Sequence, residues 1–226
     1  MSGSKYIELS NRMIPGKEPF KLETRVSDVT DILPEVTHRP DIWYVVGEVT
    51  MMTHAGTHIE FPFHHWKSGL DAADFPLERL IGEGVVLDFS SKQAGEVITL
   101  DELKQKAINH VKTGDIIFIR TDKDKLYRTP NWNDQPYFTN EAVEWLIATY
   151  QPRVVGTDAA GFEVPGTDYQ PNHLSMFKRG IPMFESATNL SAIGDRRVKI
   201  YILPLPIEGI EASPVRIIAE LIGEEK

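Results

Sequence analysis

Short apolar runs alternate along the chain with segments in which apolar residues recur every three or four positions. The runs are rich in β-branched and aromatic residues and are bounded by glycines or polar residues, which predicts β-strands over 43–50, 85–89, 116–120 and 153–156. The segments that begin near residues 99 and 139 have helical periodicity. This alternation predicts βαβ units within a mixed α/β fold.

End signals sharpen the two helices. Thr99 and Glu102 have the spacing of a capping box, with Thr99 as the N-cap and Glu102 three residues later. Thr139 is expected to cap the second helix. Between the first two strands, a short helical segment around 77–81 is expected to be closed by the glycines at 82 and 84.

The second half of the chain is expected to be more extended. A Gly/Pro-rich loop after Asp158 leads to a helical piece at 173–179, which Gly180 is expected to close. Further strands are predicted at 181–185, 199–206 and 215–219, followed by a polar tail at 223–226. No internal repeat is visible, so one domain over residues 1–226 is the expected organisation.

Composition narrows the class of protein. With 226 residues, 41% hydrophobic and 25% charged, the chain is long enough for one full hydrophobic core. It has no apolar run of membrane-spanning length and no secretory leader pattern, so a cytoplasmic protein with no membrane partner is expected. A net charge of -9 argues against a nucleic-acid partner. Because the chain has no cysteine, a metal would need His, Asp, Glu and water as ligands.

Residues 54–65 have the composition of a metal site, because they hold four of the seven histidines and one carboxylate. His54, His58, Glu60 and His64 have the same parity and would point to one face of a strand. In an extended chain, however, His54 and His58 would lie about 13 Å apart, too far to share one ion. Gly56 permits a sharp turn, so the segment is interpreted as a strand that ends in a metal-binding bend.

Other readings of these side chains remain open at this stage. The histidines would be ordinary surface or core residues if no ion binds, and His65, of opposite parity, is expected to be structural or to support the ligands. Further ligands, distant in sequence from residues 54–65, are expected in loops or at the ends of helices and strands. His173 and Glu185 are the candidates there, with Asp158 and Asp168 as competitors.

The segment His54-x-Gly-Thr-His58-x-Glu60-x-Pro-x-His64 resembles the HxGTHxDxPxH signature of the cyclase family of metal-dependent hydrolases, which includes bacterial kynurenine formamidase and isatin hydrolase. The resemblance extends along nearly the whole chain. It includes the segments 66–69, 77–82, 114–121, 155–158, 173–190, 204–209 and 213–216.

The resemblance implies a role for each matching residue. His54, His58 and Glu60 would bind a first ion, while His173 and Glu185 would bind a second. Zn²⁺ or Mn²⁺, as one or two ions, would be the cofactor. The family signature usually has Asp where this chain has Glu60, so whether Glu60 bridges two ions is open.

The resemblance also implies a fold, an assembly and a reaction. The fold would be a single domain with a mixed, barrel-like β-sheet flanked by helices, of the swivelling β/β/α type. It would assemble into homodimers or homotetramers in which N-terminal segments reach across the interface. The reaction would be hydrolysis of an amide, lactam or lactone bond of a small substrate by metal-activated water, with His64 as the acid/base residue. Aromatic residues such as Trp66 would line the pocket or the core, and the loop at 131–134 would act as a lid.

Two alternatives lie outside this reaction. The same site in a cyclase or dehydratase would use proton transfer by His64 and consume no water. A non-catalytic metal-binding protein would close its ion with four protein ligands, whereas a hydrolase needs an open coordination position.

Overall fold

The computed structural model describes residues 5–39 and 41–222, so the predicted polar tail at 223–226 lies outside the described residues. Its strands are β1 (Tyr6–Glu8), β2 (Leu22–Asp28), β3 (Val45–Met51), β4 (His58–Glu60), β5 (Ile81–Asp88), β6 (Val97–Ile98), β7 (Ile116–Arg120), β8 (Tyr137–Phe138), β9 (Val154–Thr157), β10 (Met183–Glu185), β11 (Val198–Pro204) and β12 (Ala212–Leu221). Its α-helices are α1 (Val29–Ile32), α2 (Leu100–Ala107), α3 (Asn140–Tyr150) and α4 (Pro171–Phe177). Short 3-10 helices cover Pro62–His64, Leu77–Arg79, Lys123–Leu126 and Leu190–Ala192.

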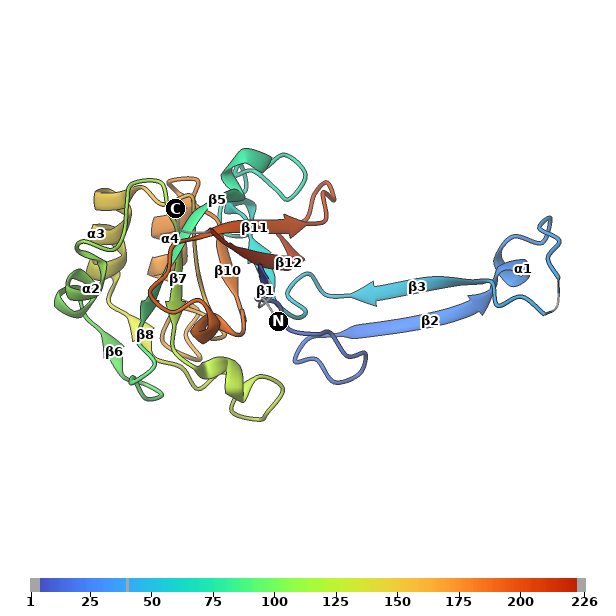
Figure 1. Cartoon of the computed structure of the whole chain (residues 1–226), viewed down its shortest axis with the longest axis horizontal. Helices are drawn as coiled ribbons and strands as arrows, with labels where there is room; N and C mark the ends of the chain where they lie inside the picture. The colour runs from blue at the N-terminus through green and yellow to red at the C-terminus, as the bar shows by residue number, and fades with distance from the viewer. Residues whose placement is uncertain (1–4, 40, 223–226) are drawn as a thin grey trace.

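A closed mixed β-barrel forms the body of the protein (Figure 1). Within the described residues, seven strands follow one another in the order β12, β11, β5, β7, β9, β10 and β4. The ring closes because β4 also pairs with β12. The predicted βαβ units are confirmed, since β5, β7 and β9 are parallel neighbours whose connections contain α2 and α3. The barrel-like mixed sheet expected from the family resemblance is also confirmed.

Alternate residues of the barrel strands enter two separate hydrophobic clusters, because successive side chains of a strand point to opposite faces. In β7, Ile116 and Phe118 pack in one cluster with residues of β4, β11 and β12. Ile117 and Ile119 pack in the other, together with residues of α2, α3 and α4. Helices therefore flank one side of the barrel, as Figure 1 shows at the left of the molecule.

Local end signals gave accurate boundaries for the flanking helices. The side chain of Thr99 accepts a hydrogen bond from the backbone N–H of Glu102, and the Glu102 carboxylate accepts from the backbone N–H of Thr99, which completes the capping box of α2. Thr139 caps α3 by accepting from the N–H of Ala142. Gly180, with a φ of +66°, follows α4, but α4 begins and ends two residues earlier than the predicted 173–179.

The glycines at 82 and 84 do not close a helix, so that prediction was wrong. Both lie inside β5, which begins at Ile81, and the preceding helical segment is a short 3-10 helix. A Cβ at Gly84 would lie 2.7 Å from Ile200 and 3.0 Å from the carbonyl oxygen of Ile116. Gly84 is therefore needed for close packing between neighbouring strands, which a turn signal in the sequence does not distinguish from a helix end.

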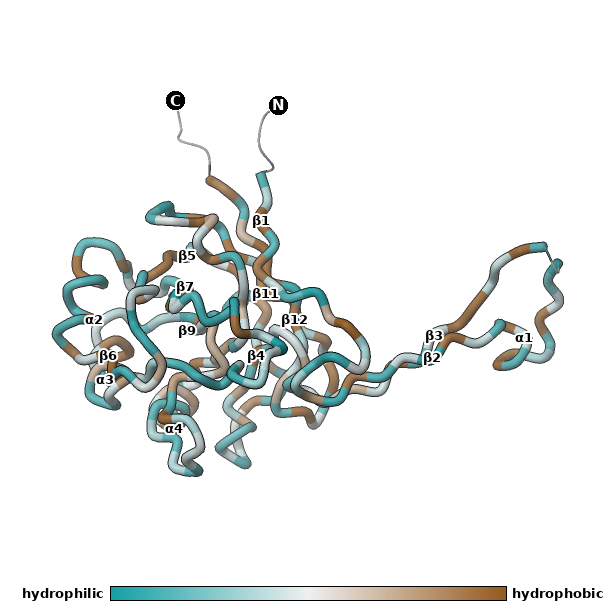
Figure 2. Tube along the Cα trace, turned by 90° about the horizontal axis from the view of Figure 1, so that it is seen from below, coloured by the Kyte–Doolittle hydropathy of each residue, from teal (hydrophilic) through white to brown (hydrophobic). Residues whose placement is uncertain are grey.

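A two-stranded arm projects from the barrel and is visible in both views of the chain trace (Figures 1 and 2). It is formed by antiparallel pairing of β2 with β3, from Leu22 opposite Met51 to Asp28 opposite Val45, and α1 lies at its far end. The strand expected at 43–50 is thus confirmed as β3. Its partner β2 and the pairing that forms the arm were not predicted.

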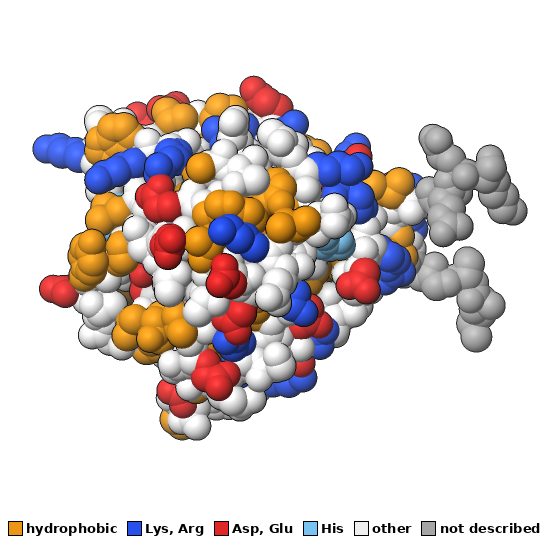
Figure 3. Space-filling model, turned by 90° about the vertical axis from the view of Figure 1, so that its left-hand side faces the viewer, with side chains coloured by type: hydrophobic (Ala, Val, Ile, Leu, Met, Phe, Trp, Pro, Cys, Tyr) orange, Lys and Arg blue, Asp and Glu red, His pale blue; other side chains and the backbone are white. Residues whose placement is uncertain are grey.

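Two observations bear on the helices and on one face of the surface in the part of the chain that the structure describes. Among those residues, no helix is long and apolar enough to cross a bilayer. The helix-covered side of the molecule seen in Figure 3 mixes Lys and Arg with Asp and Glu, and no basic stripe crosses the described residues of this face.

Candidate metal centre

The histidine-rich segment folds as a bend followed by a short strand. After β3 ends at Met51, the chain turns through 53–57, where Gly56 has a φ of +75°. His58 and Glu60 then lie on β4, after the bend and not before it. The predicted bend is present, but the order of strand and bend differs from the expectation. A side chain at Gly56 would be strained, and its Cβ would lie 3.0 Å from Met13.

β4 occupies the centre of the site because it is hydrogen-bonded along both edges. On one edge it pairs antiparallel with β10, which puts Glu185 directly opposite His58. On the other edge it pairs with β12, which puts Ala212 opposite Glu60. Opposed residues in such a pair have Cβ atoms about 5 Å apart. Strand register therefore brings Glu185 to His58, although most of the chain separates them.

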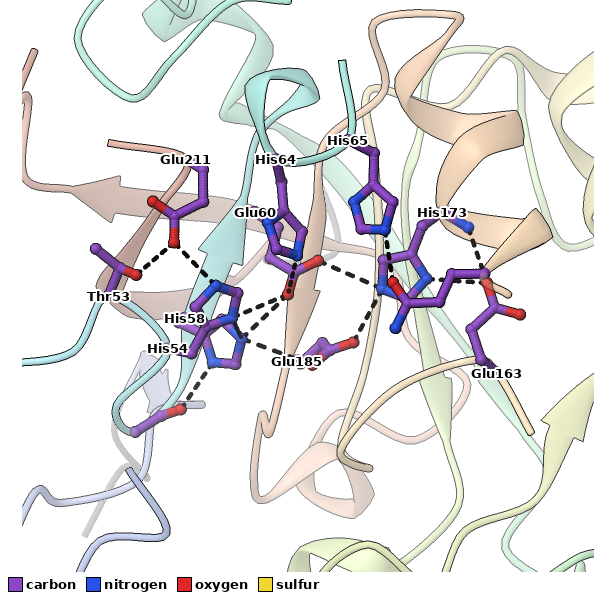
Figure 4. A network of polar contacts seen from close by, with 12 residues as sticks. Thr53, His54, His58, Glu60, His64, His65, Glu163, His173, Glu185 and Glu211 are labelled. Atoms are coloured by element: carbon purple, nitrogen blue, oxygen red, sulfur yellow. Dashed lines mark hydrogen bonds and ion pairs between the residues drawn. The ribbon is translucent and has the colours of Figure 1, made fainter. Parts of the chain in front are cut away.

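Three atoms that could bind one ion, here called subsite A, are His54 Nδ1, His58 Nε2 and Glu60 Oε1 (Figure 4). His54 Nδ1 lies 3.1 Å from His58 Nε2 and 3.1 Å from Glu60 Oε1. His58 Nε2 lies 3.6 Å from Glu60 Oε1. The bend at Gly56 thus brings two histidines together that an extended chain would hold far apart.

A second group, subsite B, consists of His173 Nε2, Glu60 Oε2 and Glu185 Oε1. His173 Nε2, from α4, lies 3.4 Å from Glu60 Oε2 and 3.5 Å from Glu185 Oε1. The other oxygen of Glu185 lies 3.6 Å from His58 Nε2 in subsite A. Each of the two carboxylates consequently has one oxygen toward each subsite.

These distances fit the geometry of bound divalent ions. Two ligands that each lie about 2.1 Å from one tetrahedral ion are about 3.4 Å apart, and the contacts within the subsites range from 3.1 to 3.6 Å. The buried Glu60 Oε2 atom has no hydrogen-bond partner among the described residues. A buried carboxylate oxygen without a hydrogen bond is costly unless a cation is nearby. The donor set of imidazole nitrogens and carboxylate oxygens also suits zinc or manganese.

Without an ion, protonated histidines balance the negative charge of the carboxylates in the centre. Burial opposes a charge on His58, but its hydrogen bonds to Glu185 and Glu60 outweigh burial and raise its pKa to about 10. Contacts with three carboxylates likewise overcome burial and raise the pKa of His173 well above its usual value. The pKa of Glu60 is held well below its usual value by three histidines despite burial. A divalent ion would have to displace these protons to bind.

His64 differs from the other histidines of the segment. Its Nε2 atom lies 3.9 Å from Glu60 Oε1, so His64 also comes within ligand spacing of His54 and Glu60, but its side chain is 27% exposed. Burial is the main cause that lowers the pKa of His64, so its imidazole is neutral near pH 7. The ring lines a cavity of about 300 Å³ together with His54, Glu60, His173 and Glu185. A neutral imidazole at the edge of such a cavity can accept or donate a proton.

The aromatic residues around the site divide between core and cavity. Phe61 is fully buried and packs against Phe75. Trp66 is 47% exposed and is not part of the cavity wall. Phe20, which no sequence signal identified, lines the cavity and contacts Trp132 edge to face at 5.8 Å. The loop at 131–134 thus lies next to the cavity, and its role as a lid stays a prediction.

The competing acids of the Gly/Pro-rich loop do not join the centre. Both Asp158 oxygens accept hydrogen bonds from Thr121 and from the backbone of Asp122, and burial raises the pKa of Asp158 to about 6. Asp168 is exposed.

His65, expected to be structural or supporting, stacks on His173 with ring centroids 5.3 Å apart and contacts Gln170. Its place beside a ligand candidate agrees with that expectation.

Two carboxylates that sequence reasoning missed contact the candidate ligands from outside. Glu211 accepts a hydrogen bond from His54 Nε2 at 3.1 Å. Glu163 accepts one from His173 Nδ1 at 2.9 Å. Glu163 stands in the loop before His173, so an acid close in sequence to a candidate histidine was an available signal. Glu211 is brought to His54 only by the pairing of β12 with β4, which has no local signal.

Comparisons with known proteins show which family the chain belongs to. The profile of the family Cyclase ("Putative cyclase") matches residues 7–164. The kynurenine formamidase of Erythrobacter litoralis is 30% identical over 173 residues, which are 76% of this chain and 76% of that protein. The kynurenine formamidase of Geobacillus thermodenitrificans is 27% identical over 231 residues, covering 96% of this chain and 98% of the relative.

A solved structure shares the fold. The crystal structure of an isatin hydrolase bound to the product analogue thioisatinate superposes with a TM-score of 0.81 at 19% identity, covering 95% of this chain and 91% of that chain. The barrel and its flanking helices therefore have the architecture of that enzyme. Together with the match of the family profile over more than half of its residues, these relationships show that the chain belongs to the Cyclase family.

Proposed function

We propose that this protein is a metal-dependent hydrolase that opens an amide or cyclic amide bond of a small substrate. The observation that carries the proposal is the pair of subsites, in which three histidines and two carboxylates converge at ligand spacing beside a cavity. The names of the relatives support the reaction type, because kynurenine formamidases and isatin hydrolase act on carbon–nitrogen bonds next to a carbonyl.

We propose that the centre binds two divalent ions, either zinc or manganese. Support comes from Glu60 and Glu185, since each has one oxygen toward subsite A and one toward subsite B. In this arrangement Glu60 would reach both ions despite its extra methylene. When bound, such ions would polarise a carbonyl oxygen and lower the pKa of a water molecule toward about 7.

The side chains of the protein would divide the remaining work. His54, His58, Glu60, His173 and Glu185 would hold the ions. His64 is proposed as the acid/base residue, because its neutral ring reaches the cavity and lies 3.9 Å from the nearest ligand atom. It would carry a proton to the leaving nitrogen of the amide.

The experiment is metal analysis of the purified protein, followed by hydrolysis assays with N-formylkynurenine, isatin and simple lactones. Two ions per chain and turnover of at least one amide substrate are expected. Absence of any bound divalent ion would contradict the metal centre. Bound ions with no turnover of any substrate would favour a non-catalytic metal-binding protein. Turnover that consumes no water would favour a cyclase or dehydratase.

A homo-oligomer, as a dimer or tetramer, is proposed from the arm. A two-stranded ribbon alone is only marginally stable in water, and nearly all residues of β2 and β3 are exposed or half-buried. The tip nevertheless exposes apolar side chains, including Trp43 at 84%, Ile42 and Ile32. A second copy of the chain would cover this surface. The cytoplasmic location expected from the sequence stays a prediction.

A further inference from the structure

Each histidine of the two subsites has one ring nitrogen toward the centre and the other on an acceptor outside it. In His54 the inner atom is Nδ1, 3.1 Å from Glu60 Oε1, and the outer atom is Nε2, 3.1 Å from Glu211 Oε1. A neutral imidazole has a single N–H group, so an acceptor on the outer nitrogen keeps the proton there. The lone pair of Nδ1 then faces subsite A.

His173 has the opposite tautomer for the same reason. Its outer atom Nδ1 donates to Glu163 Oε1 at 2.9 Å, and its inner atom Nε2 faces Glu60 and Glu185. The same oxygen of Glu163 accepts the backbone N–H groups of Asn172 at 2.8 Å and His173 at 3.0 Å. Glu163 thus holds both the ring of His173 and the start of the helix that carries it.

Glu211 is held just as firmly, although its side chain is 32% exposed. Its backbone carbonyl accepts a hydrogen bond from the N–H of Phe61 at 2.8 Å. This bond lies directly beside the paired residues Ala212 and Glu60 and continues the pairing of β12 with β4. Its carboxylate also accepts from Thr53 Oγ1 at 2.6 Å. Strand pairing and the hydroxyl of Thr53 therefore fix the oxygen that receives the proton of His54.

The third histidine does not depend on a carboxylate. His58 Nδ1 lies 3.1 Å from the carbonyl oxygen of Gly56, which belongs to the bend itself. Glu211 and Glu163 are consequently the outer side chains on which the orientation of the other two histidines depends, and they lie at opposite ends of the network in Figure 4.

From this arrangement we infer that Glu211 and Glu163 are positioning residues that control the two subsites separately. Glu211 sets the tautomer and ring orientation of His54 for subsite A, and Glu163 sets those of His173 for subsite B. This inference rests on the proposed function, since it concerns the ions that the centre would hold. Loss of a carboxylate behind a metal-binding histidine typically weakens metal affinity by about 10–100-fold.

The test compares Glu211→Met with Glu163→Met, because Met has a similar length but is a poor hydrogen-bond acceptor. Both proteins are dialysed against the same buffered Zn²⁺ concentration, and bound zinc is counted by mass spectrometry. We expect each variant to keep one ion per chain where the wild type keeps two. Cobalt-substituted samples give a second readout, because each variant should lose a different part of the visible absorption spectrum.

Further variants separate positioning from loss of structure. Glu211→Gln and Glu163→Gln keep an acceptor oxygen, so their metal affinities should fall between those of the wild type and the Met variants. Thr53→Val removes the hydroxyl that holds Glu211 and should weaken subsite A alone. The matched control is Glu144→Met, which breaks an exposed ion pair between α3 and Arg179, close to the end of α4, and should keep both ions.

Several results would overturn the inference. These are loss of both ions in either Met variant, an unchanged affinity in both, the same spectral change in both, or a wild type that holds a single ion. If a Met variant does not fold, the Gln variants decide, and no change in their metal affinity would also overturn it. A wild type that binds no divalent ion at all would instead contradict the proposed function.

Discussion

At the scale of single residues, Glu60 joins the two halves of the centre. Its Oε1 atom faces His54 and His58, and its Oε2 atom faces His173. The usual residue of the family signature at this position is Asp, which is shorter by one methylene. The longer side chain of Glu60, which starts from β4, still has one oxygen within 3.6 Å of each group. The position of the backbone, and not the length of the carboxylate side chain alone, therefore decides whether Glu60 reaches both groups of histidines.

Replacement of His64 separates proton transfer from metal binding. His64→Ala should keep the ions, because each subsite retains its three ligand candidates, while turnover falls on the order of 10²–10⁴-fold. His58→Ala removes a ligand candidate and should lose both metal and turnover. Metal analysis and steady-state assays of the two variants check this. Wild-type turnover in His64→Ala would refute the acid/base role.

The raised pKa of His58 predicts how the metal-free protein responds to pH. The group has a pKa of about 10 in the fold and 6.5 as a free side chain, so its charged form stabilises the fold. This contribution is complete below pH 6.5 and is lost as the pH rises toward 10. The melting temperature of the metal-free protein should therefore fall over that range.

His58→Gln is the control for this pH dependence, because it removes the titrating group. The decline in melting temperature between pH 6.5 and 10 should become shallower in that variant. The metal-loaded wild type should also show a flatter profile, since a bound ion replaces the proton. An equal decline in the wild type and in His58→Gln would show that other groups cause it.

At the scale of elements, the site depends on how closely β10 packs into the barrel. Gly156 of β9 lies opposite Phe184 of β10, and a Cβ at Gly156 would overlap the phenylalanine ring. Glu185 directly follows Phe184. Because Gly156 has no side chain, β10 can pack closely against β9, which places Glu185 in the centre.

Gly156→Ala should therefore destabilise the fold by about 1–3 kcal/mol, because the overlap forces a shift of the ring or of the strand. Denaturant unfolding measures the loss. Gly47→Ala on the arm is the matched control, because nothing lies within 4 Å of the added Cβ and stability should change little. Equal stability of the two variants would show that the barrel absorbs the added methyl group without strain.

The elements that the sequence predicted well are those with local signals. The capping box of α2 and the apolar run of β7 are read from a few neighbouring residues, and both appear as expected. The pairing that forms the arm was missed because β2 has few apolar residues, and its connection to β3 across α1 has no tight-turn signal. Glu211 was missed because strand register, which only the folded chain defines, places it beside His54.

At the scale of the whole molecule, the arm and the barrel have different sources of stability. The barrel buries two apolar clusters, whereas β2 and β3 bury almost nothing within one chain. An extended ribbon that keeps its register without a third strand or a core indicates a partner surface. The proposed homo-oligomer would supply it.

Shortening the arm tests that assembly. Replacing residues 27–46 by Asn-Gly joins Val26 to Gly47, which are paired in the hairpin, through a favoured two-residue turn. The shortened chain lacks Trp43 and should sediment as a monomer, while the wild type should sediment as a dimer or tetramer. Equal masses in analytical ultracentrifugation would exclude the arm as the main contact between copies.

The pairing of β4 with both β10 and β12 also determines when the candidate metal centre can form during folding. His58 and Glu60 are made early in synthesis, but their flanking strands β10 and β12 belong to the last part of the chain. Contacts between such distant segments form slowly, because a long loop must close first. A nascent chain therefore carries three of the five ligand candidates, His54, His58 and Glu60, before the strands that flank them have been made. In the proposed centre, ions would bind at full affinity only after β10 and β12 have paired with β4, so metal content would report closure of the barrel.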